Sequence, residues 1–233
     1  MHFELRTSFS ALLVGWLIVL SCNAPAFAQS NESNCGSLEN PYGPLDYRTD
    51  RANQAIVERA HFTPEVEALI RGKSNYLGGD LDYTLRAIPN HHRALMAVMR
   101  YGEKVKSPQP NDLPRSVECY FERAIRFRPD DNVVRMIYAT FLAKNVRESE
   151  AAHQLALATA SAGDNAFSHY NIGLVYFDLK DYDKALLQAH KALALGFNQT
   201  ALRDQLQAVG KWTAPEGSPT GPASNHGTND PPK

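Results

Sequence analysis

The sequence predicts an all-α fold, a solenoid of helical hairpins with an irregular N-terminal arm and a C-terminal capping helix. The second half of the chain repeats with a period of 34 residues, the distance from Asn132 to Ala166, where two alignable segments begin. Within each repeat, apolar and small residues recur at the spacing of amphipathic helices. Because one repeat cannot bury its own apolar face, about three stacked repeats and a cap are expected.

The composition is that of one folded domain and excludes several classes of function. The chain has 233 residues, a formal net charge of -1 and 43% hydrophobic residues. It lacks the clustered Lys and Arg of a nucleic-acid-binding surface or a polybasic membrane patch. Its cysteines, Cys22, Cys35 and Cys119, are too few for a disulfide-built scaffold and form no CxxC pair.

The N-terminus predicts export. An uncharged apolar run from Ser10 to Leu20 precedes a small-residue motif, AFA, that ends at Ala28. The run is shorter than the roughly 20 residues that span a bilayer. We therefore expect a signal peptide over residues 1–28 and a mature chain in the periplasm or cell envelope of a bacterium, without a transmembrane span. The alternative is a lipoprotein signal in which Cys22 is acylated.

Residues 29–63 are expected to form an irregular arm. Pro41, Gly43 and Pro44 favour extended or turning backbone between Cys35 and Arg51. After removal of the signal peptide, Cys35 and Cys119 are the remaining cysteines, in a compartment that permits oxidation. They either form a disulfide that staples the arm to the helical body or stay unpaired, with Cys119 packed as a small apolar residue.

A leading helix and a half-repeat are expected over residues 64–91. Pro64 at the first turn and Gly72 at the end fit the usual asymmetry of helix termini. The segment from Asp80 to Pro89 repeats the ending of a second helix in a later hairpin.

Three full repeats and a cap follow. The repeats span residues 92–129, with a loop inserted at residues 106–115, then 132–165 and 166–198. In the capping helix, over residues 199–212, the apolar stripe consists of Leu202, Leu206 and Val209. Residues 213–233 have almost nothing to bury and are predicted to be a disordered tail.

These repeats resemble the tetratricopeptide repeat family. The similarity is strongest in residues 166–198, where Gly173 and Tyr176 lie in the first helix and Ala185 and Ala192 in the second. The small side chains at Gly173, Ala185 and Ala192 let two helices cross closely. The arm and half-repeat are also similar to a group of exported bacterial tetratricopeptide proteins, which indicates a setting and no activity. The resemblance implies a right-handed solenoid that acts as a non-catalytic scaffold or adaptor, without a cofactor.

In this family the first helices line a groove that receives a segment of a partner protein. The resemblance places these residues in the groove: Arg93, Met96, Arg100, Lys104, Val133, Met136, Thr140, Phe167, Tyr170, Leu174 and Phe177. The groove is thus aromatic at one end and basic at the other, which suits an apolar-acidic segment or a terminal carboxylate.

Two other interpretations of these aromatic residues stay open. The first is that they pack against the capping helix or the arm as ordinary core residues. The second is that Tyr42, Leu45 and Tyr47 of the arm occupy the groove in cis.

Three histidines suggest an alternative function. Imidazoles near carboxylates can ligate zinc or copper, and the group consists of His61, His91 and His92 with Asp46, Asp80 and Asp82. The absence of HxH and HxxxH spacing favours a structural role. The runner-up is therefore a small periplasmic metal- or ligand-handling protein, and the third option a lipid-anchored envelope-assembly component that depends on Cys22. No GxSxG or P-loop motif occurs, so no enzyme is expected.

Overall fold

A computed structural model describes residues 35–215, which lie within one compact unit. The predicted signal peptide, the Cys22 alternative and the tail beyond residue 215 lie outside the described residues. Every regular element in the described range is a helix, which confirms the predicted all-α fold. None of these helices is long and apolar enough to cross a membrane.

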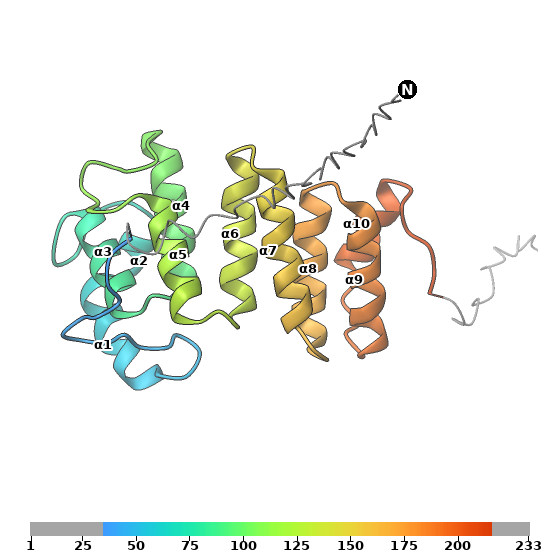
Figure 1. The fold of residues 1–233 in the computed structure, drawn as a ribbon, viewed down its shortest axis with the longest axis horizontal. Coiled ribbons are helices and arrows are strands. Elements are labelled where there is room, and N and C mark those ends of the chain that lie inside the picture. The colour runs from blue at the N-terminus through green and yellow to red at the C-terminus, as the bar shows by residue number, and fades with distance from the viewer. Residues whose placement is uncertain (1–34, 216–233) are drawn as a thin grey trace, which may run out of the picture. The chain divides into compact units, whose positions relative to one another are not determined.

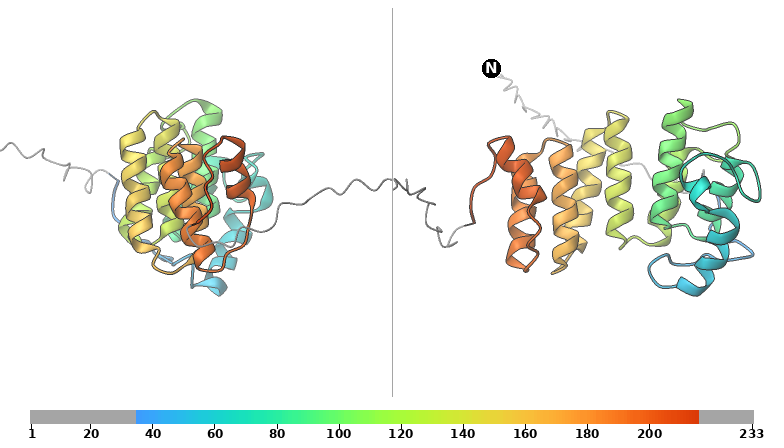
Figure 2. Two further views of the ribbon diagram at one scale, coloured as in Figure 1. Left: turned by 90° about the vertical axis from the view of Figure 1, so that its right-hand side faces the viewer. Right: turned by 180° about the vertical axis from the view of Figure 1, so that it is seen from behind.

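The helices form a stack of hairpins (Figure 1). In chain order they are α1 (Arg51–His61), α2 (Pro64–Glu67), α3 (Leu77–Ala87), α4 (His92–Val105), α5 (Val117–Phe127), α6 (Asn132–Lys144), α7 (Glu148–Ser161), α8 (Ala166–Asp178), α9 (Tyr182–Ala194) and α10 (Ala201–Ala208). The hairpins are α4 with α5, α6 with α7, and α8 with α9. The first helices pack in a row, α4 on α6 and α6 on α8, which is the arrangement of a helical solenoid (Figure 2).

The positions that recur every 34 residues form the buried side of the second helices. The side chain at each of these positions is small or apolar and points inward, so that the second helix lies close against the first helix of its hairpin. The buried residues at these positions are Val117, Phe121 and Ala124 in α5, Ala151, Leu155 and Ala158 in α7, and Ala185, Ala189 and Ala192 in α9.

Gly173 shows why a small residue is needed in the middle of α8. A Cβ atom built there would lie 2.5 Å from Cδ2 of Leu202 and 3.2 Å from Cβ of Gln188. The glycine therefore permits α8 to contact both its partner α9 and the capping helix α10.

The capping helix is shorter than predicted. Leu202 and Leu206 are buried against α8 and α9, but α10 ends at Ala208 and Val209 is exposed. The chain turns at Gly210, which has a left-handed φ of 68°. The turn brings Trp212 edge-on to His190, with ring centroids 5.2 Å apart.

The N-terminal segment is more helical than predicted at α1 and less helical than predicted after α2. The predicted irregular arm contains α1, which has no internal Pro or Gly and buries Gln54 and Val57. The predicted helix from Pro64 to Gly72 is wrong beyond α2, because Leu69 adopts a left-handed φ of 57° while burying its side chain.

The hairpin connections differ between the repeats. The loops after α6 and α8 are short, and each places a residue in the left-handed region, Val146 at φ 60° and Lys180 at φ 61°. In the first hairpin Lys106 adopts the same conformation, with φ 53°, but the chain then continues through the inserted loop to Ser116, the N-cap of α5. This loop extends beside α3 and α4 (Figure 1).

Candidate functional site

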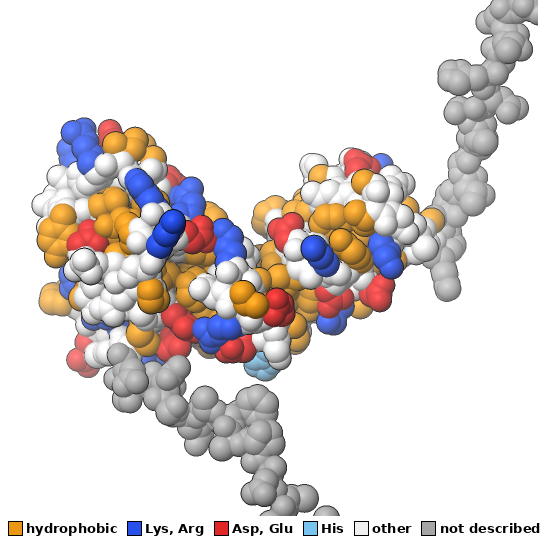
Figure 3. Space-filling view, turned by 90° about the horizontal axis from the view of Figure 1, so that it is seen from above, with side chains coloured by type: hydrophobic (Ala, Val, Ile, Leu, Met, Phe, Trp, Pro, Cys, Tyr) orange, Lys and Arg blue, Asp and Glu red, His pale blue; other side chains and the backbone are white. Residues whose placement is uncertain are grey.

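The first helices present a continuous row of side chains, which we call the first-helix face: Met96 on α4, Val133 and Thr140 on α6, and Phe167, Tyr170 and Leu174 on α8. Met96 is 39% exposed and Phe167 59%, and the other four are half-buried. Met136, which was predicted in the groove, is instead buried. Seen from above, the surface is hollowed between the α4 end and the lobe of α8 to α10 (Figure 3).

A cleft lies between α6 and α8. It has a volume of about 430 Å³, within the range of roughly 300–1,000 Å³ common for ligand sites. Its lining combines apolar stems with charges of both signs, namely Thr140, Ala143, Lys144, Glu148, Val175, Asp178, Leu179 and Lys180.

The aromatic end of the first-helix face is partly packed within the chain. Tyr170 and Phe167 contact the ring of Phe197, with centroids 4.8 and 5.9 Å away. Phe177 contacts Tyr182 at 5.3 Å, so it belongs to the packing of α8 on α9. The interpretation of these rings as core residues therefore holds for Phe177 and in part for Tyr170, whereas Phe167 stays mostly exposed.

The basic end of the first-helix face is partly covered by the end of α2 and the residues that follow it, which was not predicted from the sequence. Glu67 at the end of α2 forms an ion pair with Arg93. Arg100 donates to the carbonyl oxygen of Glu67 at 3.2 Å, and Lys104 donates to that of Leu69 at 2.8 Å. Glu67 thus pairs with Arg93, while Arg100 and Lys104 bond to neutral carbonyl oxygens and form no ion pair among the described residues.

The hypothesis that Tyr42, Leu45 and Tyr47 occupy the groove is wrong. These residues pack against the end of α3 and against α1, in a small separate cluster with Val57, Ala87, Ile88 and Tyr83. The backbone N–H of Leu45 donates to the carbonyl of Ala87 at 2.8 Å, which fixes the arm at this corner.

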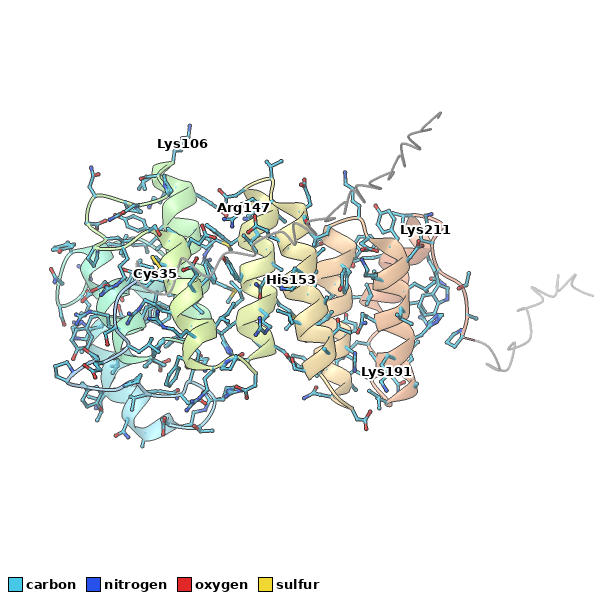
Figure 4. All side chains as sticks on the ribbon, viewed as in Figure 1. Cys35, Lys106, Arg147, His153, Lys191 and Lys211 are labelled. Carbon is cyan, nitrogen blue, oxygen red and sulfur yellow. A yellow bond between two sulfur atoms is a disulfide. The ribbon has the colours of Figure 1, made fainter. Side chains whose placement is uncertain are left out.

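The start of the arm is bonded to α5. Cys35 and Cys119 form a disulfide, with Cα atoms 5.1 Å apart (Figure 4). The buried guanidinium of Arg123 donates to the carbonyl oxygens of Cys35 and Gly36, at 3.2 and 3.3 Å. Burial and the nearby charge of Arg115 lower the pKa of Arg123 to about 10. Of the two states open at the sequence level, the structure has the bonded one.

The three histidines of the alternative function do not converge on one site. Each lies against a different carboxylate: His61 on Asp80 at 2.8 Å, His91 on Glu58 at 2.9 Å, and His92 on Asp131 at 2.9 Å. Tyr47 packs between the rings of His91 and His92. The arrangement ties α1, α3, α4 and α6 together through carboxylates, which fits a structural role.

Within residues 35–215, the one close group of potential metal ligands is the disulfide with Glu122. Its two sulfur atoms are bonded to each other, so neither is available as a thiolate ligand. The structure therefore gives no support to the metal-handling alternative.

Comparison with known proteins agrees with the repeat geometry. Residues 166–198, which comprise α8, α9 and their short loop, match the family model of the tetratricopeptide repeat. The chain thus contains a tetratricopeptide repeat in this segment, as the resemblance predicted. Such repeats are typical of non-catalytic adaptors that bind proteins or peptides. No curated protein matches the sequence.

Proposed function

We propose that the protein is an exported, non-catalytic adaptor that holds a segment of a partner protein against its first-helix face. The observation that supports this most is the exposure of Phe167 and Met96 on one row of packed first helices. Exposed large apolar side chains on a continuous surface are typical of interaction sites.

The charges around this face suggest the chemistry of the partner segment. Arg100 and Lys104 lie at one end of the face, where both bond to neutral carbonyl oxygens and form no ion pair among the described residues. Apolar side chains line the middle and the other end. We expect an apolar segment with an acidic residue at one end, bound as a helix or an extended strand. No cofactor takes part in this function.

Photocrosslinking tests the proposal. A photoreactive residue at Phe167 or Met96 is expected to form adducts with a protein of the cell envelope. The matched control is Leu187, which is 63% exposed on the second helix α9 and outside the first-helix face. Absence of adducts at both test positions, or equal adducts at Leu187, would contradict the proposal.

The proposed compartment rests on the N-terminal sequence pattern alone. N-terminal sequencing of the protein from its native envelope is expected to begin at Gln29. An acylated N-terminus at Cys22 would replace the cleaved signal by a lipid anchor, and an intact Met1 would contradict export by either route.

A further inference from the structure

A polar cleft lies at the α3 end of the solenoid and shares no residue with the first-helix face. Its volume is about 350 Å³, large enough for a small ligand. A stripe of α3, the segment before α3 and the inserted loop form its walls. The residues that carry the argument are Asn75, Tyr76, Asp82, Tyr83, Arg86 and Asn111.

The inserted loop is fastened to α3 by one carboxylate. Asp112 accepts the backbone N–H of Gly78 at 2.7 Å and the hydroxyl of Tyr101 at 2.8 Å. A Cβ atom on Gly78 would lie 2.5 Å from Cγ of Asp112, so the close approach needs glycine. This wall of the cleft is therefore formed before any ligand binds.

A second carboxylate holds the segment before α3. The buried Asp80 accepts the backbone N–H of Ser74 at 3.0 Å and contacts Nδ1 of His61 at 2.8 Å. The preceding residue of the helix, Gly79, leaves room for Asn75, whose Nδ2 would lie 2.7 Å from an added Cβ. Asp80 thus fixes the segment before α3 by hydrogen bonds and does not itself line the cleft.

The charged groups of the cleft are already paired. Asp82 accepts from Arg86 at 2.8 Å, from Arg115 at 2.9 Å and from the Tyr120 hydroxyl at 2.8 Å. Asp112 is bonded as described above. Because Asp82 and Arg86 are ion-paired and Asp112 accepts two hydrogen bonds, an ionic ligand would compete with bonds that already exist within the chain.

Neutral groups remain available. Within the described residues, the amide of Asn111 and the hydroxyls of Tyr76 and Tyr83 have no hydrogen-bond partner. The ring of Tyr76 is 60% exposed, and that of Tyr83 stacks on His61 with centroids 3.8 Å apart. A flat aromatic surface next to neutral donors and acceptors is complementary to a sugar ring, which presents C–H groups on its faces and hydroxyls at its edge.

We propose that this cleft binds a neutral sugar unit of a glycan, stacked on Tyr76 and hydrogen-bonded by Asn111 and the Tyr83 hydroxyl. The binding is independent of the adaptor function and uses a surface that the inserted loop creates.

An array of neutral and acidic glycans, probed with the mature protein, tests the inference. We expect at least one neutral glycan to bind, and titration with it to show affinity at least about tenfold weaker for Tyr76→Ala and Asn111→Ala. Tyr76→Phe keeps the ring and is expected to lose less than Tyr76→Ala. Phe167→Ala on the first-helix face is the control and is expected to bind normally.

Three results would overturn the inference: no neutral glycan bound, binding of acidic glycans alone, or unchanged affinity in both alanine variants. Both replaced side chains are exposed, so the variants are expected to fold, which circular dichroism checks.

Discussion

The N-terminal and C-terminal halves of the described chain are held together by different interactions. Between residues 35 and 131, polar side chains bond to groups far away in sequence, as Asp46 does with Arg128 at 2.6 Å, and a disulfide closes the arm onto α5. From residue 132 onwards, the buried contacts are chiefly those of apolar and small side chains at repeated positions. The regular repeats pack on their nearest neighbours, whereas the irregular start of the solenoid carries a disulfide and long-range polar bonds in addition to the apolar core that both halves share.

The largest expected effect is loss of the disulfide in Cys119→Ser. The two cysteines are separated by 84 residues, so in the chain-entropy model the bond stabilises the protein by about 4.6 kcal/mol. Denaturant unfolding of the variant measures the loss. The wild-type protein with reductant is the matched control and is expected to behave like the variant, and an unchanged unfolding midpoint in both would contradict the assigned role.

A loss of about 3 kcal/mol is expected for Leu202→Ala in the C-terminal half. Leu202 is buried against Gly173, so a shorter side chain at this position leaves a cavity. Arg203→Ala, at the exposed neighbouring position, is the control and is expected to change stability by less than about 0.5 kcal/mol. Equal effects of the two changes would mean that α10 does not cap the solenoid.

Mild acid is expected to weaken the N-terminal half through His91. Nδ1 of His91 accepts the N–H of Ala94, so the neutral ring carries its proton on Nε2 and donates it to Glu58. Burial lowers the pKa of His91 below its ordinary value of 6.5, although the hydrogen bond to Glu58 acts in the opposite direction. As the pH falls through 6.5 toward the lowered pKa of folded His91, the unfolded chain therefore binds more protons than the folded one, and the free energy of unfolding falls.

Urea unfolding at pH 7.5 and pH 5.5 measures this effect, which is at most about 1.4 kcal/mol per pH unit for one group. His91→Asn is expected to give a shallower pH dependence. The pKa values of the partner carboxylates Glu58 and Asp131 are lowered from 4.5 and 3.8. These two groups therefore change the free energy of unfolding mainly below pH 4.5, outside the range from pH 7.5 to 5.5. An equal slope in the variant would show that His91 is not the titrating group.

The smallest expected effect is a gain of roughly 0.5–1 kcal/mol for Val146→Asn. Val146 is 79% exposed and β-branched, yet adopts a left-handed φ of 60°. Asparagine tolerates that conformation better. Thermal unfolding measures the gain, with Val146→Ala as a control that keeps the strain of a Cβ atom. A loss of stability in Val146→Asn would contradict the assignment of strain to this loop.

The sequence predicts the C-terminal half well because its information is local. The period of 34 residues and the small residues at Gly173, Ala185 and Ala192 require only neighbouring helices to take effect. Short helices and arm contacts were harder to predict. The end of α2 depends on the burial of Leu69, and the ion pair of Glu67 with Arg93 joins residues that no helical spacing relates.

The candidate site follows the same division. The residues of the first-helix face were predicted from the repeat register, and Met136, predicted with them, is buried. The segment that covers the basic end and the cleft behind the inserted loop were missed, because both are made by irregular backbone. The roles of Asp80 and Asp112 were not predicted, since their partners are backbone N–H groups outside any helical spacing, six residues away for Asp80 and 34 for Asp112.

Hydrogen exchange, followed helix by helix with and without a reductant, tests most directly that the two halves are held by different interactions. Solenoid repeats interact with nearest neighbours, so a local change need not spread along the stack. Reduction is expected to remove protection from the arm, α1 and the exposed ends of α3 and α5, and to leave α8 and α9 protected. Equal loss of protection in α8 and α9, or no loss around Cys35, would contradict the account.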